Sequence, residues 1–76
     1  MIAMKKHWVK IGSENLGDGL CELFVWDPEA RQLLMALEDE FEDEELVWNV
    51  FAEAGSVEEA TKKYHDHCDQ LAQQIR

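Results

Sequence analysis

Hydrophobic and polar residues alternate near the start of the chain, and this pattern predicts an extended segment. In residues 7–12, Val9 and Ile11 fall on one side of an extended chain, while Trp8 and Lys10 fall on the other. A period of two residues is typical of a β-strand with two different faces. The first predicted element is therefore a strand over residues 7–12.

A second extended segment, residues 20–26, is apolar on both of its faces. Strands of this kind are usually covered on both sides. The stretch between the two segments, residues 13–19, is rich in Gly, Ser, Asn and Asp and predicts a turn. The two segments together predict an N-terminal antiparallel β-hairpin.

Residues 27–41 fit two different structures. Asp27 and Pro28 suit the start of a helix. Apolar residues then recur at helical spacing, at Ala30, Leu33, Leu34, Leu37 and Phe41. The alternative makes residues 27–31 a hairpin turn and residues 32–38 a third strand. Because Leu, Met, Ala and Glu favour helices, we expect the helix and keep the strand as the alternative.

Two more helices are expected in the second half of the chain. A short one follows from apolar residues at helical spacing, at Val47, Val50, Phe51 and Ala54, with Gly55 as its terminator. The last one opens with a capping box at residues 56–59 and carries an apolar stripe from Val57 to Ile75. The pattern therefore predicts the α+β class, with a hairpin or three-stranded meander packed against C-terminal helices in a single domain of residues 1–76.

Acidic residues dominate the middle of the chain. The net charge is −10, and between Glu14 and Glu59 there are fifteen acids and one base, Arg31. With 46% hydrophobic residues and three tryptophans, the chain differs from disordered acidic segments, which are poor in aromatics. A negative field of this kind repels nucleic acid and anionic membranes and attracts basic partners.

The acids are densest between Glu38 and Glu45, where Phe41 is the only residue that is not acidic. Phe41 is expected to reach the core in either structure of residues 27–41 and so to hold the run in place. Charges held in fixed positions are what a docking surface requires. The predicted partner-binding residues are Glu38, Asp39, Glu40, Glu42, Asp43, Glu44 and Glu45.

The C-terminal segment resembles the helix-turn-helix of LysR-type regulators, with Ala60, Tyr64 and Leu71 at buried positions of that motif. The resemblance implies DNA binding through a second helix that starts after Asp66. That helix would offer only Arg76 to phosphates, although DNA affinity rests on Lys and Arg. The same residues also fit one uninterrupted amphipathic helix.

Candidate chemistry is sparse. His65, His67 and Cys68 are residue types that commonly bind metals. Side chains two positions apart on a helix point roughly 200° away from each other, so His65 and His67 cannot share an ion. The acidic run lacks the Asp-x-Asp-x-Asp-Gly loop of a calcium site, and the sequence has no phosphate loop or nucleophile elbow. We therefore expect no cofactor, no metal and no enzymatic activity.

Two cysteines are too few for the disulfide framework of a small secreted domain, and the N-terminus lacks the apolar segment of a signal peptide. A cytoplasmic location is therefore expected. The predicted function is inhibition of a nucleic-acid-binding protein by charge mimicry. In size and acidity the chain is similar to phage anti-defence inhibitors such as anti-CRISPR proteins. The alternative is a cellular regulatory or adaptor module that docks on a basic surface, or that binds through an exposed Met35 or Trp48.

Overall fold

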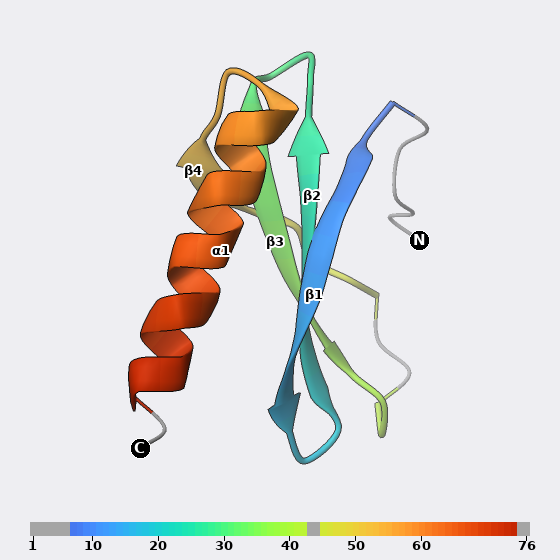
Figure 1. Ribbon diagram of the computed structural model, residues 1–76. Coiled ribbons are helices and arrows are strands. Elements are labelled where there is room, and N and C mark those ends of the chain that lie inside the picture. The colour runs from blue at the N-terminus through green and yellow to red at the C-terminus, as the bar shows by residue number, and fades with distance from the viewer. Residues whose placement is uncertain (1–6, 43–44, 75–76) are drawn as a thin grey trace.

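The computed structural model describes residues 7–42 and 45–74 of the chain. Its elements are β1 (Val9–Gly17), β2 (Leu20–Asp27), β3 (Gln32–Asp39), β4 (Asn49–Glu53) and α1 (Val57–Gln74). The strands form one antiparallel sheet in the order β1-β2-β3-β4, and α1 lies across one face of it (Figure 1). The α+β class is confirmed. Within the described residues, the expected meander has a fourth strand, and one helix stands where several were expected.

The N-terminal hairpin forms as predicted, but its first strand is longer. β1 continues through most of the predicted connector to Gly17 and pairs with β2. The turn is short because Gly17, Asp18 and Gly19 all adopt a positive φ, of 86°, 54° and 79°. Glycine reaches this region without steric cost, so the chain can reverse there directly.

The helix expected over residues 27–41 is wrong, and the alternative strand is correct. The carboxylate of Asp27 accepts hydrogen bonds from the backbone N–H groups of Glu29 and Ala30, which closes a tight turn instead of capping a helix. β3 then pairs with β2 along its whole length without a register shift. Leu33 and Leu34 are both buried, on opposite faces of the sheet. Pairing with the two-faced β2 thus overrides the local helix preference of this segment.

The short helix expected near residues 47–54 is also wrong, because this segment is β4. β4 contains an irregularity opposite Leu33 and Leu34. Its apolar residues therefore do not alternate strictly, and their spacing also fits a helix. The ring of Phe51 packs edge-on against Phe24 at 5.3 Å between ring centroids. Gly55 does not end a helix but precedes one, and its N–H donates to the Glu59 carboxylate at 2.6 Å.

The predicted C-terminal helix is confirmed. It begins after Ser56, whose hydroxyl accepts a hydrogen bond from the N–H of Glu59 at 3.1 Å. The helix packs on the sheet through Tyr64, and the ring lies so close to Gly12 that a Cβ there would be 2.7 Å from it. The buried cluster between helix and sheet consists of Phe24, Leu33, Ala54, Ala60 and Tyr64. Tyr64 thus fixes the position of α1 over β1.

The second face of the sheet is covered by residues 45–48, the described end of the connector between β3 and β4. Val25 and Ala36 project from the face opposite α1, yet they are almost fully buried. The connector crosses this face on its way to β4 (Figure 1). Its Trp48 meets Trp8 edge-on at 5.4 Å between ring centroids. The connector therefore takes the place of a second helical layer.

Replacing Tyr64 by Phe tests how α1 is held. The Tyr64 hydroxyl donates to the backbone carbonyl of Ser13 at 2.8 Å, so Tyr64→Phe should lower the free energy of unfolding by about 1 kcal/mol at neutral pH. Burial, together with Cys68 and Glu14, raises the pKa of Tyr64 from 10.0 to about 12.

The pH dependence of this variant gives a separate readout. Because the unfolded chain ionises Tyr64 first, the wild type should lose stability between pH 10 and about 12. The Phe variant should not show this contribution, and urea unfolding across that range measures the difference. Parallel stability curves for the two proteins would contradict the assigned role of Tyr64.

Candidate functional site

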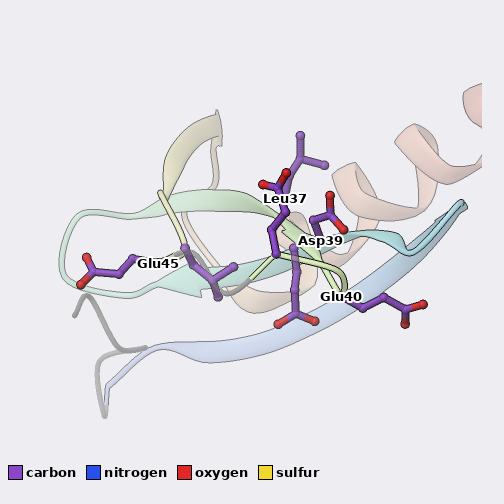
Figure 2. A pocket seen from close by; sticks show the side chains of 7 residues that line it. Leu37, Asp39, Glu40 and Glu45 are labelled. Atoms are coloured by element: carbon purple, nitrogen blue, oxygen red, sulfur yellow. The ribbon is translucent and has the colours of Figure 1, made fainter.

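The described part of the acidic run gathers around one hollow at the end of β3. Glu38 and Asp39 end the strand, Glu40 and Glu42 follow in the turn, and Glu45 lies in the connector. The hollow has a volume of about 300 Å³, and we call it the acidic hollow. It is lined by Leu37, Glu38, Asp39, Glu40, Glu42, Glu45 and Leu46 (Figure 2). Two predicted partner-binding residues, Asp43 and Glu44, lie outside the described residues.

Hydrogen bonds from three backbone N–H groups hold the first part of the run in place. The N–H of Glu40 donates to the carbonyl of Gly19 at 2.9 Å, which ties the run to the β1–β2 turn. The N–H of Phe41 donates to the Asp39 carboxylate at 2.9 Å, and the N–H of Glu42 donates to the Asp39 carbonyl at 3.2 Å. These bonds define the backbone from which Glu38, Glu40 and Glu42 project.

The expectation that Phe41 reaches the core is wrong. Its side chain is 76% exposed, because β3 ends at Asp39 and Phe41 falls in the turn beyond it, past the packed part of the sheet. The ring lies over the backbone of Gly19, where a Cβ would be 2.7 Å from Phe41 Cδ2. Leu37 is 54% exposed. The acids are therefore accompanied by two exposed apolar side chains, one of them aromatic.

Negative charge extends from the acidic hollow to the neighbouring hairpin turn. A second hollow of about 220 Å³ under that turn is lined partly by Asp18, Glu38 and Glu40. Neither hollow has a described Lys or Arg in its lining. Arg31 and Lys63 line a hollow near the β2–β3 turn, at the opposite end of the strands. Acids are present there too, because Glu53 and Glu59 line the same hollow. The two ends of the strands thus differ in that basic side chains accompany the acids only at the β2–β3 end, among the described linings of these three hollows.

The metal-ligand residue types of the helix take part in packing. His67 Nε2 lies 2.9 Å from the carboxylate of the buried Glu22, and the Cys68 thiol donates to the Glu14 carboxylate at 3.3 Å. His65 is exposed. Among the described residues, no three His, Cys, Asp or Glu side chains are grouped so that they could hold a metal ion. These contacts instead attach the second half of α1 to β1 and β2.

Cys68 has the environment of an unreactive thiol. Burial raises its pKa above the usual 9.0, and the neighbouring Glu14 and Glu22 act in the same direction. Thiolate is the reactive form of cysteine, so this site suppresses nucleophilic chemistry.

The structure does not support two of the alternatives considered for the sequence: a helix-turn-helix in the C-terminal segment, and a freely exposed Met35 or Trp48. Residues 57–74 form one continuous helix, so the two-helix arrangement suggested by the resemblance to LysR-type regulators is not formed. Met35 is half-buried against the core cluster. Trp48 is half-buried as well, and its indole N–H has no hydrogen-bond partner among the described residues. Neither is a freely exposed anchor.

The predicted acids that are described line one hollow, but their neighbours Leu37, Leu46 and Asp18 were not predicted to lie beside them. The helical stripe expected over residues 27–41 includes Leu37, whereas in the structure β4 ends its pairing at Met35 and Leu37 is exposed beyond it. Leu46 lines the acidic hollow because the connector turns under the sheet. No local pattern in the sequence indicates either arrangement.

Neutralising the acidic hollow should stabilise the fold. The variant Glu38→Gln, Asp39→Asn, Glu40→Gln and Glu42→Gln, called the hollow variant, relieves like-charge repulsion while Asn keeps the Oδ1 acceptor for the turn. The free energy of unfolding should rise by on the order of 1 kcal/mol at low salt. At about 1 M salt the gain should largely vanish because of screening.

A matched control carries the same charge change elsewhere. The helix-side variant, Glu53→Gln, Glu58→Gln, Asp66→Asn and Asp69→Asn, alters four exposed acids outside the acidic hollow. Urea unfolding of both variants compares the two regions. An equal gain in the control would show that net charge alone, and not crowding at the acidic hollow, sets the effect.

Cys68 should react slowly with alkylating reagents in the folded protein. In a Cys21→Ser variant, Cys68 is the only thiol, and its raised pKa and partial burial should slow iodoacetamide modification at neutral pH by about tenfold or more relative to the urea-unfolded chain. Mass spectrometry over time measures the rate. Similar rates in the two states would contradict the packing assigned to Cys68.

Comparison with known proteins gives no independent indication of function. No family model, curated protein or solved structure matches this chain. No helix among the described residues is long and apolar enough to cross a membrane. Function is therefore inferred from the acidic hollow and its surroundings.

Proposed function

We propose that this chain is a non-enzymatic binding module that inhibits a nucleic-acid-binding protein by occupying its basic surface with the acidic hollow. The observation that carries the proposal is the gathering of Glu38, Asp39, Glu40, Glu42 and Glu45 around one hollow. The backbone on both sides of Phe41 is held by hydrogen bonds. Carboxylates that project from a held backbone lose less conformational entropy on docking than those of a free tail.

Charge density makes a nucleic-acid-binding surface a suitable target. Duplex DNA carries one negative charge per about 1.7 Å of its axis, and proteins that bind it present clustered Lys and Arg side chains. A protein with a net charge of −10 is attracted to such surfaces over a long range, and its densest run of acids lies around the acidic hollow. Its docking would exclude the nucleic acid without any chemical step.

The second candidate is a regulatory or adaptor module that docks on a basic surface without displacing nucleic acid. The exposed Phe41 favours this reading, because aromatic residues frequently anchor protein interfaces and a mimic of phosphates does not need one. Leu37 adds exposed apolar surface beside the same acids. The two candidates share the binding surface but differ in what the partner does when it is bound.

Competition with nucleic acid tests the proposal. Immobilised protein would capture binders from lysate at low salt, and those released by high salt would be assayed for DNA and RNA binding. We expect a captured protein to lose its nucleic acid when wild-type protein is added, with half-maximal effect near the measured Kd. The hollow variant should compete at least about tenfold more weakly, because four charges are removed from the contact.

The helix-side variant is the control for net charge. It should compete nearly as well as the wild type. Equal competition by the hollow variant would rule out the acidic hollow as the binding surface. Capture that depends on the acidic hollow, but leaves nucleic-acid binding of the captured protein unchanged, would favour the adaptor.

A further inference from the structure

Beside the acidic hollow, one edge of β3 has no partner strand among the described residues. β4 pairs with only the first half of β3, from Gln32 to Met35. The second half, residues 36–39, pairs with β2 on one side, but no described strand pairs with it on the other. The acidic hollow lies at this half of β3. Among the described residues, the last part of β3 therefore has a partner strand on one side only.

The direction of the free backbone groups follows from the hydrogen bonds at the two ends of β3. The carbonyl of Arg31 accepts from Ala54 at the end of β4, and the N–H of Glu40 donates to Gly19 beside β2. Backbone groups alternate in direction along a strand, so those of odd-numbered residues point toward the β4 side. The N–H and carbonyl of Leu37 therefore point to the open edge, where no described residue bonds to them.

This edge is more suitable for strand addition than the outer edges of the sheet. β1 contains two register shifts along its pairing with β2, and β4 is short and contains one. Such irregularities interrupt an edge and discourage further pairing. β3 pairs with β2 without any shift. Its second half therefore offers a regular edge.

We infer that an extended basic segment of the partner protein pairs with this edge as an additional strand, next to Leu37 and Asp39. This inference rests on the proposed function and specifies how its partner binds. Strand addition uses main-chain hydrogen bonds for affinity and alternating side chains for specificity. The acidic hollow supplies the charges that select Lys and Arg.

The side chains of β3 also indicate the pattern of the segment. A residue directly opposite Leu37 exchanges hydrogen bonds with it and shares its face, so an apolar side chain there would cover exposed leucine. The intervening residues would lie on the face of Glu38, where Lys or Arg meets carboxylates that line the same hollow. The preferred segment therefore alternates apolar and basic residues.

A second copy of this chain is a poor occupant for the edge. Pairing two such edges would bring the acidic runs of both copies together, and like charges opposite each other destabilise strand pairs. Charged side chains at an edge are a common way to prevent self-association. The same charges that exclude a second copy attract a basic strand.

A peptide of alternating lysine and valine, with blocked ends, tests the inference. In the predicted register the valine amides bond to β3, and the lysine amides point outward. Methylating the valine amide nitrogens should weaken binding by about tenfold or more, whereas methylating the lysine amide nitrogens should leave the affinity nearly unchanged. Binding of the unmodified peptide should also slow hydrogen exchange at the Leu37 amide, measured by NMR.

Each other outcome would overturn the inference. Equal affinity of the two methylated peptides, or unchanged exchange at Leu37 in the bound state, would mean that basic chains bind without strand pairing. Weaker binding to the hollow variant than to the helix-side variant would then leave the proposed function standing. If both variants bind the peptide as strongly as the wild type, both the inference and the proposed function are excluded. Absence of peptide binding, or Leu37 protection that rises with protein concentration alone, would also exclude the inferred partner strand.

Discussion

The path of the chain after β3 determines most of the surface of this protein. The turn tied to Gly19 and Asp39 leads into a connector whose residues 45–48 cross the second face of the sheet and do not run along the edge of β3. This route buries Val25 and Ala36 without a second helix. It also leaves the last part of β3 without a partner strand on one side among the described residues. Covering one face and exposing one edge are therefore two consequences of the same connection.

The acids lie in a part of the fold that contributes little to the buried core. The core between α1 and the sheet depends on Phe24 and Tyr64, and Phe24 lies opposite Met35, before the acids of β3 begin at Glu38. At the end of β3 the side chains are exposed, so carboxylates there keep most of their hydration. Like-charge crowding still costs some stability. A costly arrangement that the core does not require is consistent with a binding role.

The sequence predicted the elements whose signals are local. The apolar period after Ser56 and the cap itself determine α1, and the two-faced pattern of residues 20–26 determines β2. The secondary structure of residues 32–39 could not be predicted from local signals, because the leucines fit a helical face and a two-faced strand equally well. Pairing with β2 decided between them, and such pairing depends on residues distant in sequence.

The composition of the site was predictable, but its shape was not. The acids were expected to act together, and the described ones do line one hollow. The exposure of Phe41 and the free edge at Leu37 depend on where β3 and β4 end, which no residue nearby in sequence indicates. The pairing of strands distant in sequence thus determines how these charges are arranged on the surface.

The salt dependence of binding to a basic partner tests the central claim most directly. If the acidic hollow makes the contact, the slope of log Kd against log salt concentration should be nearly the same for the wild type and the helix-side variant, and clearly shallower for the hollow variant. The two variants have equal net charge, so general attraction affects them alike. Equal slopes for both variants would contradict the assignment of binding to the acidic hollow.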